Sequence, residues 1–255
     1  MTAPPLHSLP LFVRLAGRPV ILIGSGDAAG AKRRLLERAG ATIVGEADAT
    51  ARLAIVADDD AAVARLKARG VLVNAVDRPE LCDFTLPAIV DRAPVLLAIG
   101  TGGVSAGLAA ALRQRLETIL PASLGRLAEA LHAARTALRT ALPDGGDRRR
   151  AIGAALAPGG TLDSLACHDG ADVTAAVVGA TPQVGLVRLV LASGEPDELT
   201  LRQARLLAAA DRVTHRRNVP AAILDRARAD AMRECRDDAP ETAAEGLTVD
   251  VAMAA

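Results

Sequence analysis

A run of small and polar residues near the start of the chain has the types and spacing to bind phosphate. Gly24-Ser25-Gly26-Asp27-Ala28-Ala29 fits the pattern G-x-G-x-x-A, with small residues at Gly24, Gly26 and Ala29. The first glycine of such a pattern allows a tight turn, and the second lets the backbone approach a pyrophosphate closely. The third small residue lets a helix pack against a strand. The run therefore predicts a dinucleotide-binding turn.

The elements on either side of this run decide whether it binds a nucleotide or is a plain structural turn. Residues 20–23 are consecutively apolar, which is typical of a short buried strand. Residues 31–39 carry apolar side chains at helical spacing. A helix that begins directly after the glycines offers unpaired N–H groups and a partial positive charge to a phosphate. Both flanking elements favour nucleotide binding.

Two further residues that could do chemistry, Asn74 and Asp77, lie toward the carboxyl end of a strand predicted at residues 71–77. In open α/β sheets, ligands bind beyond the carboxyl ends of the strands. Asp77 is therefore well placed for chemistry. Arg78-Pro79 ends the strand, and residues 79–84 are expected to form a loop.

Acidic residues follow two further predicted strands. Glu46, Asp48 and the adjacent Ala49 come after a strand at residues 41–44, where an acidic side chain often holds the ribose hydroxyls of NAD. The alternative is that these carboxylates are solvated loop residues. Asp58-Asp59-Asp60 follows a strand at residues 53–57 and is expected to cap a helix at residues 61–69.

The rest of the chain predicts an α/β protein that becomes mainly helical. Strands are expected at residues 85–90, 95–99 and 187–191, and helices at 106–120, 123–142, 199–210 and 219–234. A small-residue loop, Gly100-Thr101-Gly102-Gly103-Val104-Ser105, precedes the helix at 106. Arg148-Arg149-Arg150 is expected to be a solvated helix start rather than a binding site. The polar, alanine-rich tail at residues 236–255 is expected to be mobile.

Composition narrows the possible functions. The 255 residues contain 30 Lys plus Arg and 30 Asp plus Glu, so the net charge is zero, whereas a nucleic-acid-binding protein is usually basic. Two Phe and no Tyr or Trp leave few side chains for base stacking. The three cysteines are far apart, which fits a reducing cytoplasm and disfavours a structural metal site. We expect no signal peptide and no membrane segment.

Several further motifs, together with the glycine turn, resemble the N-terminal half of siroheme synthase, the precorrin-2 dehydrogenase and sirohydrochlorin ferrochelatase module. The resemblance extends from Leu9 to about Leu156. Its motifs are Leu9-Pro10-Leu11-Phe12, Asn74-Ala75-Val76-Asp77, Pro79-Glu80-Leu81-Cys82-Asp83-Phe84, Pro87-Ala88-Ile89-Val90-Asp91-Arg92, Gly102-Gly103-Val104-Ser105, Leu120-Pro121 and Leu124-Gly125. In this order they are far more specific than the glycine turn alone.

The resemblance implies a Rossmann-like NAD-binding domain, a small dimerisation segment and a helical region, assembled as a homodimer. The expected divisions are residues 1–105 for the NAD domain with its dimerisation strands and 106–160 for the helical region. Residues 161–235 resemble the opening of the uroporphyrinogen methyltransferase half of siroheme synthase. There Ala192-Ser193-Gly194-Glu195-Pro196-Asp197 stands in place of the family's G-x-G-P-G-D. We therefore expect a structural remnant there.

The resemblance also implies a reaction, in which precorrin-2 is oxidised to sirohydrochlorin with NAD and ferrous iron is inserted to give siroheme. Asp77 matches the family's acid/base residue, and one carboxylate could serve both proton removal steps. Iron is then a substrate, and no resident metal site is expected. Ser105 matches a serine beside the tetrapyrrole pocket, although a helix N-cap is an equal alternative. Further candidates for substrate contact are Asn74, Arg78, Arg92 and Arg113.

The sequence departs from the family between Val44 and Leu53, where a helix and a strand that the family usually has are nearly absent. Ala57 also stands where the family has a threonine, so one NAD contact is lost. Two functions therefore remain open. One is an enzyme with dehydrogenase and chelatase activity, favoured by Asp77 and the glycine turn. The other is an NAD- or tetrapyrrole-binding module that has lost turnover, favoured by the shortened connection.

Overall fold

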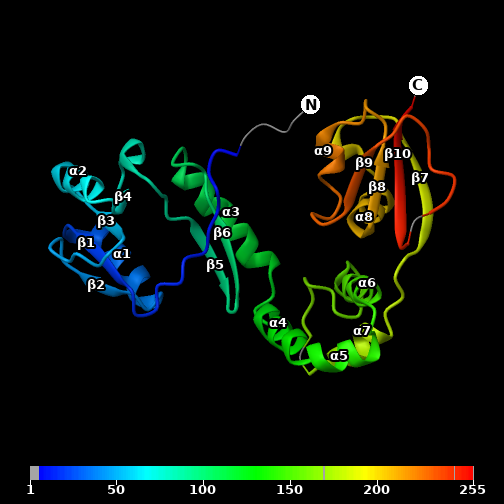
Figure 1. The fold of residues 1–255 in the computed structure, drawn as a ribbon, viewed down its shortest axis with the longest axis horizontal. Helices are drawn as coiled ribbons and strands as arrows, with labels where there is room; N and C mark the ends of the chain where they lie inside the picture. Colours follow the sequence, from blue (N-terminus) through cyan, green and yellow to red (C-terminus); the bar gives the residue numbers. More distant parts are fainter. Residues whose placement is uncertain (1–5, 169, 244, 255) are drawn as a thin grey trace. The chain divides into compact units, whose positions relative to one another are not determined.

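The computed structural model describes residues 6–168, 170–243 and 245–254 (Figure 1). The chain divides into two compact units. The first contains the residues up to Asp91 together with Leu96–Thr118, and the second contains Arg92–Val95 and the residues from Ile119 onward. Each unit is built around its own parallel sheet.

The first unit has the Rossmann-like α/β fold that the sequence predicts. Four parallel strands form a sheet in the order β2-β1-β3-β4. Their bounds are Pro19–Ile23 for β1, Thr42–Val44 for β2, Leu53–Val56 for β3 and Leu72–Ala75 for β4. Helix α1, Gly26–Arg38, connects β1 to β2, and α2, Asp60–Ala68, connects β3 to β4 (Figure 1).

Alternating side chains of the strands bury the two faces of this sheet against different helices. Ile21 and Val56 pack in one cluster with Leu66 of α2. Their neighbours Val20 and Ile55 pack in a second cluster with Leu36 of α1. Period-two alternation sends adjacent residues to opposite faces, so α1 and α2 cover opposite sides of the sheet. This arrangement leaves the carboxyl ends of the strands open at one edge.

The first unit continues beyond this sheet. A short 3-10 helix, η1, spans Pro79–Leu81, and strands β5, Ala88–Arg92, and β6, Val95–Ile99, form a two-stranded sheet. Helix α3 spans Ala106–Ile119. Arg113 Nε of α3 donates to the carbonyl oxygen of Ile89 at 2.9 Å, which ties the helix to β5. The strand predicted at residues 85–90 is β5, which begins and ends later, at Ala88–Arg92.

The second unit begins with helices. They are α4, Leu124–Ala133, α5, Arg135–Ala141, α6, Gly145–Leu156, and α7, Val173–Val178. The helix predicted at 123–142 is divided at Ala134, which caps α4 and α5. Leu138, Ala155 and Val177 are among the buried residues at the centre of this helical cluster. No helix among the described residues is long and apolar enough to cross a lipid bilayer.

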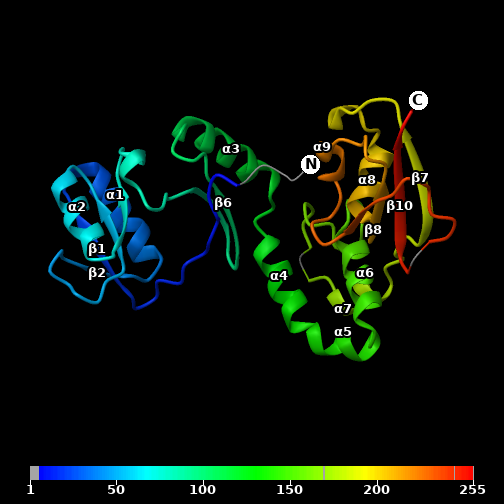
Figure 2. The ribbon, with the colours of Figure 1, turned by 45° about the horizontal axis from the view of Figure 1, so that its top comes forward.

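A second parallel sheet completes this unit, with strand order β7-β10-β8-β9 (Figure 2). Its strands are β7, Gly185–Leu191, β8, Arg212–His215, β9, Met232–Cys235, and β10, Leu247–Met253. The short helix η2, Pro196–Glu198, precedes helix α8, Leu201–Ala209, and α9 spans Ala221–Leu224. Leu207 of α8 and Ile223 of α9 are fully buried against the sheet.

Two predictions for this region are wrong. The tail at residues 236–255 was expected to be mobile, but β10 pairs with β7 on one side and with β8 on the other. Val249 and Val251 in β10 are both 0% exposed, so burial and two ladders of hydrogen bonds hold the strand in place. The helix predicted at 219–234 is instead α9 followed by β9. The divisions at residues 105 and 160 stay predictions.

Candidate functional site

The loop after β1 requires a glycine at its first position. Gly24 has a φ of +111°, a conformation that other residues rarely adopt. A Cβ at Gly24 would lie 2.7 Å from the carbonyl oxygen of Ala57, which follows β3. The turn therefore brings the ends of β1 and β3 together, at the point where the strand order reverses. In such sheets this is the position where a dinucleotide binds.

The N-terminus of α1 is open toward solvent. Gly26, the first residue of α1, has a φ of +76°. Apart from its two chain neighbours and the backbone of α1, no described residue lies within 4 Å of the position of its absent Cβ. Ser25 is the N-cap in an extended conformation, and its side chain makes no capping hydrogen bond within the described chain. The first N–H groups of α1 are thus available to an anion.

The other residues of the predicted turn fit the same use. Asp27 lies in the first turn of α1 and is exposed, whereas Ala29 is 4% exposed and packs inward. Ala28 between them is half-buried. A small residue at Ala29 lets α1 approach the sheet, as the sequence pattern predicts. Because Gly24 has no room for a side chain and Gly26 leaves space in front of the helix, the turn fits a pyrophosphate.

The acidic residues after β2 are engaged with the protein itself. Glu46 accepts two hydrogen bonds from the guanidinium of Arg65, at 2.7 and 3.0 Å, and this pairing lowers the pKa of Glu46. The carboxylate of Asp48 accepts from the Thr50 hydroxyl at 2.7 Å and from the Ala51 amide at 2.9 Å. These bonds, led by that of Thr50, lower the pKa of Asp48. Ala49 is exposed beside them.

Two strained aspartates follow adjacent strands of the sheet. Asp58 after β3 has a φ of 59°, and Asp77 after β4 has a φ of 57°. Positive φ is uncommon for residues other than glycine and concentrates at functional sites. Both residues are exposed and line a cavity of about 110 Å³, together with Val76 and Arg78. Neither carboxylate has a hydrogen-bond or ion-pair partner among the described residues.

The other charged residues around this cavity, Asp59, Asp60 and Arg78, are already paired. Asp59 accepts a hydrogen bond from the Ala62 amide at 2.8 Å and so caps α2, as predicted. Arg78 bonds to Asp60 and to Glu80, each at 2.6 Å. The Arg78 guanidinium lowers the pKa of Glu80. Arg78 therefore reaches the cavity as part of an ion-pair network, and a substrate carboxylate would have to compete for it.

Asn74 does not line the cavity with Asp77. Its side chain is 7% exposed, and its amide nitrogen donates to the carbonyl oxygen of Phe84 at 3.0 Å. The same nitrogen lies 3.5 Å from Sγ of Cys82. These contacts of the Asn74 side chain hold residues 82–84 against β4. The structure gives Asn74 a positioning role.

Ser105 caps a helix. Its hydroxyl oxygen accepts a hydrogen bond from the Leu108 amide at 3.1 Å, in the first turn of α3. The glycine loop before it lies close to the end of β4, because a Cβ at Gly103 would meet Cβ of Pro79 at 2.8 Å. The loop with Ser105 and the turn with Asp77 therefore meet within the first unit.

The remaining predicted arginines are held by backbone carbonyls. Arg113 donates to Ile89, and its guanidinium also pairs with Glu117 at 2.8 Å. Arg92 belongs to the second unit, where its Nη2 donates to the carbonyl oxygen of Leu120 at 3.1 Å. The structure thus brings the glycine turn, Asp77 and Arg78 to one edge of the first sheet. Asn74 is not brought to that edge, and Arg92 belongs to the other unit.

Asp58 is the residue that sequence reasoning missed. The sequence pattern predicts that Asp58, Asp59 and Asp60 cap a helix, but Asp59 is the one of the three that makes the capping bond. Its position directly after β3 was the available signal, because the ends of neighbouring parallel strands meet at one edge. Its positive φ was not visible in the sequence.

Comparison with known proteins finds a family model and a solved structure to which this chain is similar. Residues 45–88 match the model of a protein family described as "Putative NAD(P)-binding". The matched segment contains β3, α2 and β4, and with them Asp58 and Asp77. The chain is also similar to a solved structure described as SirC, precorrin-2 dehydrogenase. That similarity has a TM-score of 0.46 and 21% sequence identity, and covers 56% of this chain and 87% of the other.

Curated relatives confirm the resemblance to siroheme synthase. The chain is 38% identical over 267 residues to siroheme synthase of Methylococcus capsulatus, which covers 88% of this chain and 56% of that protein. Siroheme synthase of Azotobacter vinelandii is 38% identical over 263 residues, with the same two coverages of 88% and 56%. Siroheme synthase of Chromobacterium violaceum is 34% identical over 266 residues. The chain spans little more than half the length of these relatives.

Proposed function

We propose that this chain takes part in siroheme biosynthesis and oxidises precorrin-2 to sirohydrochlorin with NAD. One observation carries the proposal: the unpaired, strained Asp77 lies at the edge of the sheet where the glycine turn opens. The similarity to siroheme synthases supports the tetrapyrrole substrate. The match to an NAD(P)-binding family supports a nicotinamide cofactor, and the choice of NAD over NADP is part of the proposal.

The residues that would hold the cofactor are those of the turn and of the neighbouring strand end: Gly24, Ser25, Gly26, Asp27, Ala28, Ala29, Asp48 and Ala49. The backbone of Gly24–Gly26 and the N-terminus of α1 would bind the pyrophosphate. The ribose contact would fall to Asp48, whose remaining carboxylate oxygen is not used by the bonds to Thr50 and Ala51. When bound, NAD supplies a hydride acceptor.

Asp77 would accept the proton that leaves the substrate. Its carboxylate is exposed and has no partner among the described residues, so both oxygens are accessible. A base that is not engaged in a salt bridge loses no hydrogen bond when it takes up a proton. The strained backbone fixes the direction of the side chain, and Asn74 supports it by holding the 79–84 loop. Ser105 and Arg78 lie on the adjoining loops and would contact the macrocycle.

Iron insertion extends the proposal. Ferrous iron would enter as a substrate, and Asp77 would take protons from the pyrrole nitrogens as the metal binds. We further propose that Arg113 orients a carboxylate of the macrocycle, in exchange for its present partners, the carbonyl oxygen of Ile89 and the carboxylate of Glu117. Incubating sirohydrochlorin with ferrous iron under anaerobic conditions, and following the spectrum of the macrocycle, tests the second activity separately from the first.

A homodimer is part of the same proposal. The first unit exposes several large apolar side chains on its N-terminal segment, β6 and α3, among them Leu11, Phe12, Leu96, Leu108 and Leu112. Exposed apolar surface of this extent is typical of an interface. A second copy of the chain would cover it. Analytical ultracentrifugation of the full chain is expected to give a dimer, and a monomer at micromolar concentration would contradict this proposal.

The decisive experiment compares Asp77→Asn with Asp59→Asn. Both changes remove one negative charge from the same cavity, but asparagine at position 59 can still cap α2. With precorrin-2 and NAD under anaerobic conditions, Asp77→Asn is expected to reduce kcat by about 10²-fold or more while NAD binding is retained. Asp59→Asn is expected to keep most of the rate. Equal losses in the two variants would assign the effect to cavity charge rather than to a base.

A binding module without turnover is the second candidate. The observation that favours it is the commitment of Glu46 to Arg65 and of Asp48 to its own turn, within a shortened connection between β2 and β3. Such a module would bind NAD or the tetrapyrrole without producing NADH. Calorimetric binding with no NADH formation in the wild-type chain would select this candidate and reject the enzyme.

A further inference from the structure

A second cavity lies in the other unit and has no role in the proposed reaction. It has a volume of about 610 Å³, is open to solvent on one side, and is lined by residues of α6, of α8 and of the segment before β7. Cavities of about 300–1,000 Å³ are the usual size of small-molecule sites. The first sheet and its glycine turn contribute none of its lining residues.

The cavity is bounded by one face of each of two helices. From α6 the lining residues Arg150, Gly153 and Ala154 follow helical spacing, and Ala157 continues the same face just beyond the helix. From α8 the lining residues Leu201, Ala204, Arg205 and Ala208 follow the same spacing. Because the central side chains on both faces are small, they leave the space between the helices unfilled.

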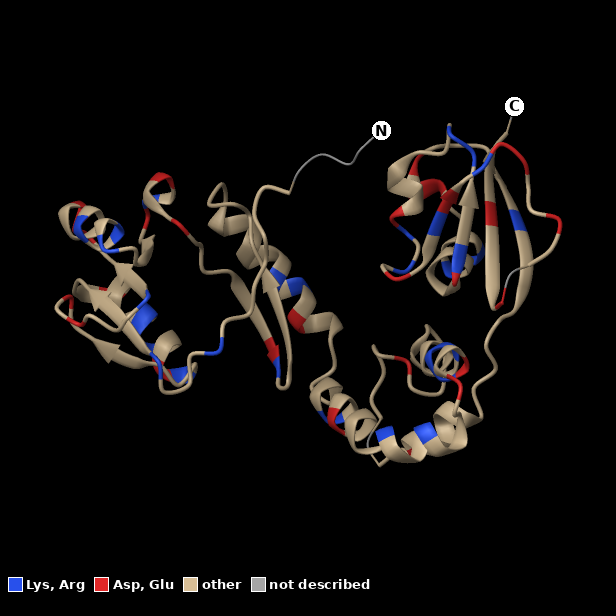
Figure 3. Ribbon diagram, in the orientation of Figure 1, with Lys and Arg blue, Asp and Glu red and all other residues tan. Residues whose placement is uncertain are grey.

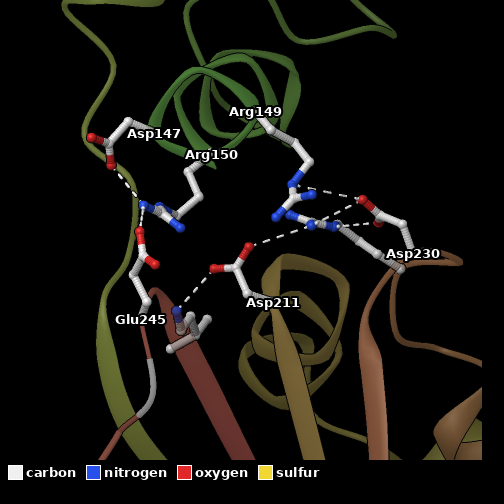
Figure 4. Close-up of polar contacts among 8 residues, drawn as sticks. Asp147, Arg149, Arg150, Asp211, Asp230 and Glu245 are labelled. Atoms are coloured by element: carbon white, nitrogen blue, oxygen red, sulfur yellow. Dashed lines mark hydrogen bonds and ion pairs between the residues drawn. The ribbon is translucent and has the colours of Figure 1, made fainter. Parts of the chain in front are cut away.

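Ion pairs beside the cavity hold α6 to the second sheet (Figure 4). Arg150 Nη2 bonds to Asp147 at 2.6 Å and to Glu245 at 2.7 Å. These carboxylates raise the pKa of Arg150, whose side chain is only 10% exposed. Asp211 accepts a hydrogen bond from the Leu247 amide at 2.9 Å, which anchors its carboxylate to β10. On the side of the cavity that faces the sheet, Arg150 and Asp211 are therefore held in place by their contacts with Glu245 and Leu247.

Most charged groups of the cavity are neutralised by these contacts. Arg228 lies 3.4 Å from Asp211 and 2.9 Å from Asp230, and the Arg228 guanidinium lowers the pKa of Asp230. Arg205 differs, because its guanidinium has no ion pair or hydrogen bond within the described part of the chain. Figure 3 shows basic and acidic residues spread over the whole fold. Of the three arginines that line the cavity, Arg150, Arg205 and Arg228, Arg205 is the one whose charge is not paired within the described residues.

We propose that this cavity binds a small organic anion with an apolar body, whose carboxylate or sulfonate group pairs with Arg205. The body of the ligand would contact Ala204 and Ala208 on α8 and Ala154 on α6. Thr181 and Gln183 at the rim supply further hydrogen-bonding groups. One unpaired cation beside apolar walls suits a single anionic group, whereas a polyphosphate would need several cations or backbone amides.

The test uses two fluorescent probes of nearly the same shape on the full chain. Anilinonaphthalene sulfonate carries one negative charge, and phenylnaphthylamine carries none. Three variants are compared with wild type: Arg205→Ala removes the cation, Ala208→Leu fills the cavity, and Arg202→Ala removes an arginine of α8 that does not line it. Ala137→Leu on the exposed face of α5 is the control for added volume.

The expected result is saturable binding of one sulfonate probe per chain. Arg205→Ala should weaken that binding about fivefold and leave the neutral probe unchanged, because only the charged contact is lost. Ala208→Leu should weaken both probes about tenfold, because the space for the shared apolar body is reduced. Arg202→Ala and Ala137→Leu should bind both probes as wild type does. Melting temperatures recorded alongside verify that each variant is folded.

Three outcomes would overturn the proposal. The first is non-saturable or absent binding of the sulfonate probe to folded wild-type protein. The second is an equal effect of Arg205→Ala and Arg202→Ala, which would assign binding to general surface charge. The third is undiminished binding to folded Ala208→Leu, which would place the probe outside this cavity. None of these measurements depends on precorrin-2 or NAD, so the proposed reaction and this site succeed or fail separately.

Discussion

The two parallel sheets present different groups at their carboxyl edges. In the first unit, Gly24 leaves β1 with a φ of +111°. Beyond its chain neighbours and the backbone of α1, Gly26 has no described atom within 4 Å of its absent Cβ. In the second unit, the loop after β7 carries Gly194 at the comparable place, but a Cβ there would meet Cγ of Pro220 at 2.9 Å. The first edge leaves space for a ligand, and the second is covered by its own chain.

The carboxylates of the two sheets also differ in exposure and in pairing. Asp58 and Asp77 at the first edge are exposed and unpaired among the described residues. Asp250 on β10 is 3% exposed and accepts hydrogen bonds from Thr214 at 2.6 Å and from Arg216 at 3.0 and 3.1 Å. One sheet keeps its acids accessible, while the other uses its acid to hold strands together. Both sheets have four parallel strands, although in different orders, and their use depends on the groups left free at the edge.

The comparison predicts the largest loss of stability for Asp250→Ala. The change leaves the guanidinium of Arg216, which is 21% exposed, without its carboxylate. Breaking a buried ion pair by removing one partner typically costs about 3–5 kcal/mol. Thermal unfolding should therefore show the second unit melting well below its wild-type temperature. NAD affinity, measured by calorimetry below that transition, should be unchanged. A loss of NAD affinity in still-folded protein would contradict the separate use of the two edges.

Matched glycine substitutions compare the two loops directly. Gly24→Ala places a Cβ against the backbone of Ala57 at an unfavourable φ, so it should destabilise the first unit by about 2–4 kcal/mol and abolish NAD binding. Gly194→Ala meets only the ring of Pro220 and should cost about 1–2 kcal/mol in the second unit, with NAD binding retained. Calorimetry of binding and of unfolding separates these effects. Retained NAD affinity in Gly24→Ala would reject the turn as the phosphate site.

The first edge was predictable from sequence because its signals are local. The Gly24–Ala29 pattern, the apolar run before it and the helix after it lie within one continuous segment. The same holds for Asp77, which follows a short apolar strand directly. What remained hidden was the conformation and the pairing of each side chain. The ion pairs of Arg78 and the hydrogen bond from Asn74 to Phe84 depend on loops that sequence pattern does not describe.

The second edge was harder to predict because its signals are long-range. β10 lies between β7 and β8 in the sheet. In the sequence, α9 and β9 separate β10 from β8, and β7 is further away still. In the sequence, Asp250 interrupts the apolar pattern of β10, so the segment resembles a polar tail. In the structure, Thr214 and Arg216 donate hydrogen bonds to this carboxylate. Residues 219–234 are rich in alanine and arginine, which favoured a helix, but tertiary pairing with β8 makes Met232–Cys235 a strand.

A moderate effect is expected for Asp58→Asn, a change at the first edge that keeps the backbone conformation. Asparagine tolerates positive φ well, so the melting temperature should stay near that of wild type. The cavity loses one carboxylate next to Asp77, and kcat/KM for precorrin-2 should fall about three- to tenfold, mainly through KM. Asp197→Asn, in the loop after β7, is the matched control and should leave the kinetics unchanged. Identical kinetics for Asp58→Asn and wild type would exclude Asp58 from the site.

The smallest effect is expected in the acid range, where each unit should respond through its own carboxylates. The pKa of Asp48 in the first unit is lowered mainly by the Thr50 hydroxyl, and that of Asp230 in the second mainly by Arg228. A carboxyl group with a folded pKa below its unfolded value of about 3.9 stabilises the fold above that pH. This stabilisation is lost as the pH falls through the folded pKa. Asp48→Asn should therefore lower the melting temperature of the first unit by about 2 °C or less at pH 6, and the difference should shrink as the pH falls below the unfolded pKa of about 3.9. Asp230→Asn should do the same in the second unit alone.

Calorimetric scans of both variants from pH 6 to pH 2.5 test this pH dependence. A difference in melting temperature from wild type that does not change with pH would show that the hydrogen bonds contribute through geometry rather than charge.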